Sequence, residues 1–430
     1  MGGVMPSDPA QAARPTDRSA EAWEHAQLFL LERLREGASE KIEQPWSGEQ
    51  WRNVANEARR NRVHLLLWHR LKDPPWRDAV PADVAAGLRE QYRQNALRNA
   101  LLFRQASSIV SAFAGAGIPT LLLKGLHLAL AVYPEPVLRS MADLDLMVPR
   151  SQLVDAQQVL LGMGYGTRPR ADASFSAAHF HHLERLVRDG AEVVELHHAI
   201  ELPTSPFRID VSALWDAARQ VQVGGATARV LSDEHLVIHL CIHLAWHHAF
   251  GRAGLKALLD LTTLANARAA TLDWPLVVHT AHEWRAEAFV RCALVMARDL
   301  LGAAIPDGSL GSMRHDAFDD TAVTSAKRLV LARPLPHAVG PEASRPPEGL
   351  LQRAHYLALG LVPPLAQLRR GYGRPTVESA LRLYPRRFRD LVQRRGTTIL
   401  RAARERDTAW AVVQHLIDRG RIAHWIARHS

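Results

Sequence analysis

Two carboxylates, the acid pair Asp143 and Asp145, lie in an otherwise apolar segment, residues 139–148 (RSMADLDLMV). Successive side chains of a β-strand point to opposite faces, so the acid pair would share one face while Leu144 and Leu146 enter the core. Two like charges at this spacing repel each other, and the arrangement costs free energy unless a positive group lies between them. A divalent metal ion is the simplest such group, because Mg²⁺ (or Mn²⁺) binds carboxylates together with substrate phosphates.

A third acid is expected on a neighbouring strand. Residues 181–200 contain two strand-like runs joined by Asp189-Gly190, and Asp-Gly between such runs is a strong hairpin signal. In the second run, Glu195 shares a face with His197. Glu195 and the acid pair would then lie on one small sheet. The alternative is that the acid pair forms the polar face of an edge strand and that Glu195 is solvated.

The elements that would position these acids follow one another closely. Residues 118–123 (IPTLLL) predict a buried strand, and Gly125 lies at the turn into a helix. The strand with the acid pair ends at Pro149, and the next helix has Ser151 as its expected N-cap. Together with the hairpin, this order predicts a small α/β module over residues 117–206.

The chain has 430 residues, which is too long for one ordinary core. Apolar positions three and four residues apart predict helices on both sides of the module. The expected fold class is therefore α+β, with a small mixed sheet and mainly α-helical flanking regions. The expected parts are a disordered tail (1–19), a helical N-terminal region (20–116), the module (117–206), a helical domain packed on it (207–333), and a proline-containing linker with a basic helical C-terminal region (334–430).

The cysteine content and the hydropathy of the chain indicate in which cellular compartment the protein is expected. Cys241 and Cys292 lie in helix-like apolar segments and form no CxxC pair, which favours a reducing compartment. The N-terminal segment lacks the apolar core of a secretory signal. No apolar run reaches the roughly 18 residues that span a bilayer. We therefore expect a cytoplasmic protein without a transmembrane segment.

Basic residues concentrate near the C-terminus, where residues 368–430 hold fifteen arginines and five acids. The net charge of the whole chain is +9, so the remainder is nearly neutral. Arginine clusters attract phosphate backbones and anionic lipids, so an acidic or anionic-lipid partner is one expectation. The alternative is a solvated helix face in an arginine-rich composition.

Four histidines recur at intervals of four residues: His235, His239, His243 and His247. On a helix they form one slowly drifting stripe, and pairs four residues apart can chelate a metal ion. No HExxH motif is present and apolar residues intervene, so a packed helix is favoured over a metal site. Three further histidines near the hairpin are mostly expected at the surface: His179, His181 and His182.

Residues 121–148 (LLLKGLHLALAVYPEPVLRSMADLDLMV) resemble the signature of the uncharacterised nucleotidyltransferase family, within the DNA polymerase β-like superfamily. The superfamily pattern is an apolar strand that ends in Gly, a helix, an acid-x-acid strand and a third acid on a later strand. The resemblance is clear over 118–200 and weaker up to about residue 265. The matching residues are Lys124-Gly125, Arg139, Asp143, Asp145 and Glu195-Leu196-His197.

This resemblance implies two-metal transfer of a nucleotidyl group from an NTP, with release of pyrophosphate. The acid pair and Glu195 would be catalytic and would bind Mg²⁺ (or Mn²⁺). Leu126 stands where the superfamily has Ser or Gly, so phosphate binding would fall to Lys124 and the helix N-terminus. The implied nucleotide-binding residues are Lys124, Gly125, Arg139, His197, His243 and His247, of which the last two could also contact the acceptor.

The acceptor could be a small molecule, a peptide or a protein. A second hypothesis is a non-catalytic nucleotide-binding regulatory protein. A third is an RNA-directed nucleotidyltransferase, which only the arginine-rich region supports. Two residues also have simpler explanations: Lys124 as a structural lysine at a strand end, and Arg139 in a salt bridge to the acid pair.

Overall fold

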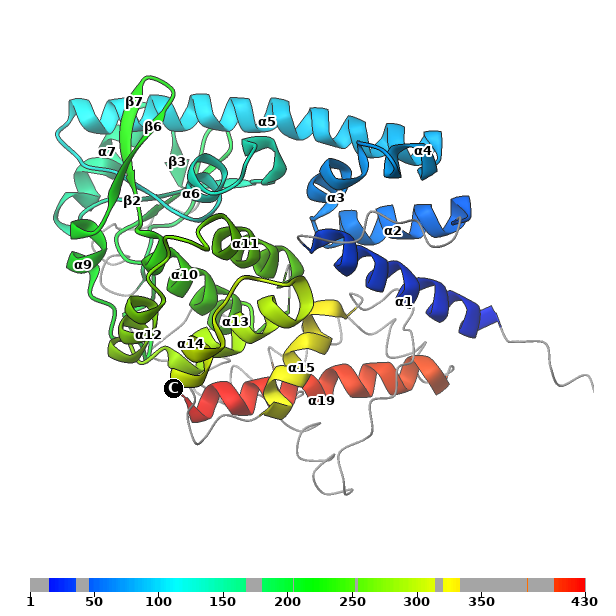
Figure 1. Cartoon of the computed structure of the whole chain (residues 1–430). Helices are drawn as coiled ribbons and strands as arrows, with labels where there is room; N and C mark the ends of the chain where they lie inside the picture. Colours follow the sequence, from blue (N-terminus) through cyan, green and yellow to red (C-terminus); the bar gives the residue numbers. More distant parts are fainter. Residues whose placement is uncertain are drawn as a thin grey trace, which may run out of the picture.

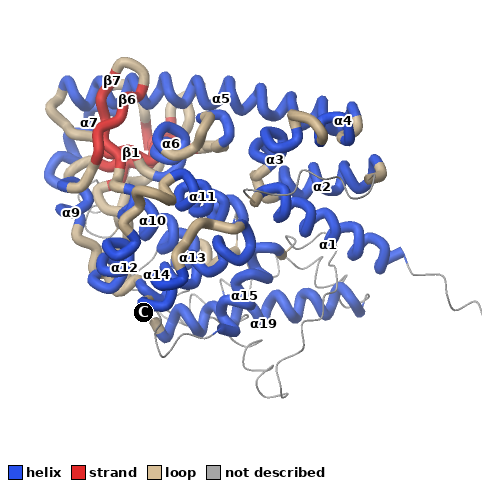
Figure 2. Tube along the Cα trace, viewed as in Figure 1, coloured by secondary structure: helices blue, strands red, loops and turns tan. Residues whose placement is uncertain are grey.

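A seven-stranded mixed sheet carries the acid pair in the part of the chain that the computed structural model describes (Figure 1, Figure 2). The strand order is β3-β4-β5-β2-β1-β7-β6. β2 runs parallel to β5 and β1 parallel to β7, whereas the other neighbours are antiparallel. The strands are β1 (Leu121–Leu122), β2 (Asp143–Met147), β3 (Gly166–Thr167), β4 (Leu186–Val187), β5 (Val193–His197), β6 (Arg219–Val223) and β7 (Ala226–Val230).

The structure describes most of the chain up to residue 332 and a C-terminal helix. The described residues are 15–35, 46–167, 180–203, 205–251, 254–313, 320–332, 385 and 406–429.

One face of the sheet packs on two helices, α5 (Ala82–Gly115) and α7 (Leu153–Gly162). Figure 1 shows the long α5 running across the sheet. Side-chain alternation places Leu144 and Leu146 of β2 on this face, where both are fully buried. They share one hydrophobic core with the apolar sides of both helices and with the inward residues of β5. Burial of this face therefore fixes the register that sends the acid pair to the other face.

The opposite face of β2 meets a helical layer. Met147, which shares that face with the acid pair, belongs to the core of this layer. The acid pair therefore points to the boundary between sheet and helices. The elements of the layer are α10 (Asp233–Ile242), the π-helix η3 (His243–His247), α11 (Gly254–Ala267) and α13 (Glu287–Leu301).

The remaining helices surround these layers. N-terminal α1 reaches α13, since Arg35, just past its end, donates a 3.0 Å hydrogen bond to the Leu300 carbonyl. The other helices are α1 (Pro15–Leu34), α2 (Gly48–Arg60), α3 (His64–Leu71), α4 (Trp76–Ala79), α6 (Lys124–Ala131), α9 (Val211–Asp216), α12 (Trp274–Glu283), α14 (Asp307–Ser312), α15 (Asp320–Leu331) and α19 (Arg406–Arg428), with 3₁₀ turns η1 (Pro136–Leu138) and η2 (Arg150–Gln152).

The expected α+β class is confirmed: a mixed sheet carries the acids and helices flank it. The hairpin around Asp189-Gly190 is present, with Leu186 of β4 paired to Val194 of β5. The expected N-cap at Ser151 is wrong. That residue lies inside η2, which follows Pro149, and the N-cap of α7 is Gln152, whose side chain makes no capping bond.

The helical region expected over 207–333 is wrong in its first part. β6 and β7 form a hairpin around Gly224-Gly225, and β7 pairs with β1, so the sheet extends to Val230. Alternating residues on both sides of a Gly-Gly pair are a hairpin pattern that the sequence itself carries. Near the N-terminus of the chain, α1 begins at Pro15, which lies inside the expected disordered tail 1–19.

This hairpin offers a matched pair of substitutions. Gly224 has φ +59°, and an added Cβ would lie 2.7 Å from Ser107 Oγ, whereas Gly225 has open space around it. Gly224→Ala should lower the free energy of unfolding by about 1–2 kcal/mol, because alanine is strained at this φ and meets α5. Gly225→Ala should change it by less than about 0.5 kcal/mol. Urea titration of both variants measures the difference, and equal effects would contradict this turn geometry.

Most of the basic C-terminal region lies outside the described residues. In the described part of α19, Ile417, Ile422 and Trp425 are buried, and Arg328 of α15 donates a 2.6 Å hydrogen bond to Asp418. This part of the region therefore packs on the protein, and a partner for the arginines stays a prediction.

Among the described helices, none has the length and apolar character needed to cross a membrane.

Candidate functional site

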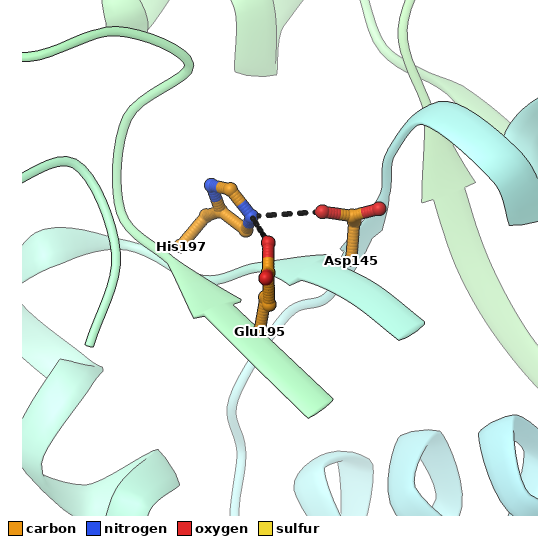
Figure 3. A group of neighbouring side chains, drawn as sticks. All are labelled: Asp145, Glu195 and His197. Atoms are coloured by element: carbon orange, nitrogen blue, oxygen red, sulfur yellow. Dashed lines mark hydrogen bonds and ion pairs between the residues drawn. The ribbon is translucent and has the colours of Figure 1, made fainter. Parts of the chain in front are cut away.

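The parallel pairing of β2 with β5 brings the predicted acids together. In this register Asp145 lies beside Glu195, and Asp143 lies beside Val193. Figure 3 shows Asp145, Glu195 and His197 pointing toward one another from the two strands. One ligand atom from each of the three lies within 4.8 Å of the others, and all three residues are buried. The predicted sheet face is therefore present, and His197 lies on it beside Glu195 as the alternation predicts.

Lys124 neutralises the most buried of these acids. Its Nζ donates a 2.7 Å hydrogen bond to Asp145 Oδ1, and the lysine side chain is only 17% exposed. Lys124 is the first residue of α6 and has φ +43°, a left-handed conformation that is unfavourable for a residue with a Cβ. This strained backbone conformation occurs at the turn from β1 into α6. It directs the Lys124 ammonium group toward Asp145. Gly125, the next residue, lies against Met141.

His197 completes the contacts of Asp145. Its Nε2 lies 3.1 Å from Asp145 Oδ1 and 3.9 Å from Glu195 Oε2. Burial, and then the charge of Lys124, lower the pKa of His197 to about 4. The ring is therefore neutral near pH 7 and donates the Nε2 proton to Asp145. In the other tautomer, the same nitrogen offers a lone pair to a metal ion.

Asp143 carries a charge that no bonded partner among the described residues neutralises. Its carboxylate is half-buried and has no hydrogen bond or ion pair with any residue that the structure describes. Burial, then the charges of Asp145 and Glu195, raise its pKa above the ordinary value of 3.8. Glu195 is held on its other side by Arg185, whose Nε donates a 2.8 Å hydrogen bond to Oε1. The site therefore keeps more negative charge than its own cations neutralise.

The donor set fits a hard divalent cation. Two carboxylates and one imidazole nitrogen converge, and the described residues donate no hydrogen bond to Asp145 Oδ2 or Glu195 Oε2. Mg²⁺ and Mn²⁺ accept carboxylate oxygens together with substrate phosphates, which fits the two carboxylates of this set. In the structure, the Lys124 ammonium group supplies part of the positive charge that offsets the repulsion between the acids.

Arg139 lies away from the acids. It is buried and its Nε donates a 2.7 Å hydrogen bond to Asp260 Oδ1 of α11. Tyr133 Oη donates a second hydrogen bond of 2.7 Å to the same oxygen. The simpler expectation of a salt bridge to the acid pair is therefore wrong, since Asp260 holds the guanidinium. This contact fixes the loop before β2 to α11, so it positions the loop. Phosphate binding by Arg139 stays a prediction.

The histidine stripe continues into a cluster beside the acids. His247 Nε2 lies 3.0 Å from Glu201 Oε2, and the rings of His243 and His247 have centroids 5.2 Å apart. His181 bridges the stripe to the acid site, with ring centroids 5.5 Å from His247 and 5.4 Å from His197. Burial lowers the pKa of His243 well below 6.5, so its ring is neutral near pH 7.

The sequence does not predict that several residues of this region lie beside the acids. His181 and His182 are half-buried against His197 rather than at the surface, and His179 lies outside the described residues. Asp260 could have been found, because a lone acid in the apolar run LLDLTTLA requires a buried partner. Nothing in the local sequence marks His181, since its position depends on the pairing of distant segments.

Comparison with known proteins places these residues in a family. A family model described as uncharacterised nucleotidyltransferase matches residues 47–302, which is more than half of the chain. The match extends beyond the resemblance over 118–265 on both sides, and it includes α2 as well as α13. None of the curated proteins matches the chain.

Proposed function

Because the chain belongs to the uncharacterised nucleotidyltransferase family, we propose that it transfers a nucleoside monophosphate from an NTP to a hydroxyl or phosphate group of an acceptor, with Mg²⁺ or Mn²⁺ as cofactor. The observation that carries this proposal is the β2–β5 register, which sets Asp145 beside Glu195 with Asp143 on the same face. A sheet face with three mutually repelling carboxylates and one buried lysine suits a metal-bound triphosphate.

Each residue would have a distinct task. The metal would be held by Asp143, Asp145 and Glu195, with help from His197. When bound, the metal neutralises phosphate charge and lowers the pKa of the attacking hydroxyl. Lys124 would turn from Asp145 to a phosphate oxygen. The first N–H groups of α6, which have no side-chain cap, would bind the same phosphates.

The reaction itself is an in-line displacement. The acceptor oxygen forms a bond to the α-phosphorus, and the bond from that phosphorus to the bridging oxygen of the β-phosphate breaks. Pyrophosphate leaves, and the acceptor proton passes to solvent. The contribution of the protein is to orient the triphosphate between Lys124 and the acids and to stabilise the charge that develops.

Pyrophosphate release tests this proposal. The purified protein is incubated with each of the four NTPs and Mg²⁺ or Mn²⁺, with acceptors offered in separate reactions: sugar phosphates, nucleosides, hydroxyl-bearing peptides and short RNAs. We expect one NTP and one acceptor class to release pyrophosphate together with a nucleotidylated acceptor. Release with RNA alone would favour the RNA-directed alternative. NTP binding without pyrophosphate release in any reaction would favour the regulatory alternative and contradict the proposal.

A further inference from the structure

Lys256 of α11 is the one lysine among the described residues that forms no ion pair. The structure describes four lysines, and the other three form ion pairs: Lys72 with Glu135, Lys124 with Asp145 and Lys327 with Asp299. Lys256 is half-buried and forms no hydrogen bond or ion pair with any described residue. A half-buried ammonium group without a counter-charge costs free energy. Functional sites can retain groups that lower stability in this way.

The surroundings of Lys256 connect it to the acid site. Lys256 lies one helical turn before Asp260, on the same side of α11, and Asp260 holds Arg139 in the loop before β2. The charges of Arg139 and Arg62 lower the pKa of the ammonium group, and the charges of Asp260 and Asp143 raise it. Burial, and then the charge of Arg139, lower the pKa of Lys256 to about 7. Lys256 therefore lies among charges of both signs, where the buried Arg139–Asp260 contact borders the acid site.

The site thus has one carboxylate and one ammonium group that are not paired with each other. Asp143 and Lys256 lie close enough to influence each other electrostatically, yet they form no ion pair. A ligand that carries a cation at one end and phosphate groups at the other would satisfy both. A metal-bound triphosphate has this charge distribution, because its metal meets the carboxylates and its outer oxygens remain negative.

We propose that Lys256 binds the terminal phosphates of the nucleotide and thereby selects triphosphates over monophosphates. This inference rests on the proposed nucleotidyl transfer. It assigns to α11 a direct part in binding, in addition to its contact with Arg139. Because the carboxylates lie on the sheet and Lys256 on the helical layer, the triphosphate would bridge the two layers of the fold.

Lys256→Gln separates this role from a structural one. Isothermal titration with MgATP, MgCTP, MgGTP and MgUTP, and with the corresponding monophosphates, gives affinities for wild type and variant. We expect triphosphate affinity to fall about 10–100-fold, as for loss of one charged hydrogen bond, and monophosphate affinity to change less than about threefold. The melting temperature without nucleotide should stay equal or rise, because the unpaired charge is removed. Lys327→Gln, which removes a surface ion pair on α15, should leave both affinities unchanged.

The outcomes distinguish this inference from the proposed function. Wild-type binding of an NTP with equal binding by Lys256→Gln would overturn the role of Lys256 and leave the proposed function intact. A lower melting temperature together with equal losses for triphosphate and monophosphate would show that Lys256 is structural, which also overturns it. Absence of NTP binding by the wild type would contradict both proposals.

Discussion

Asp143→Asn should abolish nucleotidyl transfer while leaving the free protein at least as stable as the wild type. Activity should fall by at least about 10²–10³-fold, because the variant loses one of three carboxylates that would hold the metal and its phosphates. Stability should not fall, because the Asp143 carboxylate has no partner among the described residues and is repelled by Asp145 and Glu195. We expect the free energy of unfolding to rise by up to about 1 kcal/mol at pH 7.

The pH dependence of this difference follows from the raised pKa of Asp143. A raised carboxyl pKa means that the folded state binds a proton more tightly than the unfolded chain, so ionisation of Asp143 costs stability as pH increases. The advantage of Asn over Asp should therefore be present at pH 7 and should vanish as pH falls toward the ordinary value of 3.8. Urea titrations with a chelator present, at several pH values, measure it.

A matched control is Asp155→Asn on the outer face of α7, where the acid is exposed. That variant should keep full activity and its stability within about 0.5 kcal/mol of the wild type. A large loss of stability in Asp143→Asn would contradict this account, in which the Asp143 carboxylate serves function and lowers the stability of the free protein.

The second large effect concerns the buried contact between α11 and the loop before β2. Asp260→Asn should lower the free energy of unfolding by about 3–5 kcal/mol, because it leaves the Arg139 guanidinium buried without a counter-charge. Tyr133 loses its charged acceptor in the same step. Arg139→Gln should cost a similar amount, and the double variant should cost much less than the sum, because each single change strands the other group.

Urea unfolding of the three variants completes the double-mutant cycle. The surface acid Asp299, which pairs with Lys327, provides the comparison, and Asp299→Asn should cost less than about 1 kcal/mol. If Arg139→Gln left stability unchanged and weakened only NTP binding, Arg139 would be a phosphate ligand, and the positioning role assigned to it would be wrong.

The sequence predicts the acidic face well because that face depends on local rules. Alternation in DLDLM sends the acid pair to one side and Leu144 and Leu146 to the other, and Asp189-Gly190 marks the hairpin that delivers Glu195. The pairing of β2 with β5 brings these acids side by side. The assignment of catalytic, metal-binding and nucleotide-binding roles to individual residues stays a prediction.

The sequence fails where the contacts are long-range. Arg139 is separated from Asp260 by 121 positions, and no local pattern joins an arginine loop to a buried acid on a later helix. His181 likewise meets two distant segments, at His197 of β5 and His247 of η3. The β6–β7 hairpin is a different case, because its alternation and Gly-Gly turn are visible in the sequence, and the strong helical signals after residue 230 obscure them.

The central claim is that the acids on β2 and β5 form a metal–triphosphate site. Its most direct test is isothermal titration of the wild type and Asp145→Asn with the four NTPs, each with and without Mg²⁺, alongside the melting temperature of both proteins. We predict that the wild type binds at least one NTP only when Mg²⁺ is present, and that Asp145→Asn remains folded and loses this binding. Equal binding by both folded proteins, or wild-type binding that is independent of metal, would contradict the assignment of the site.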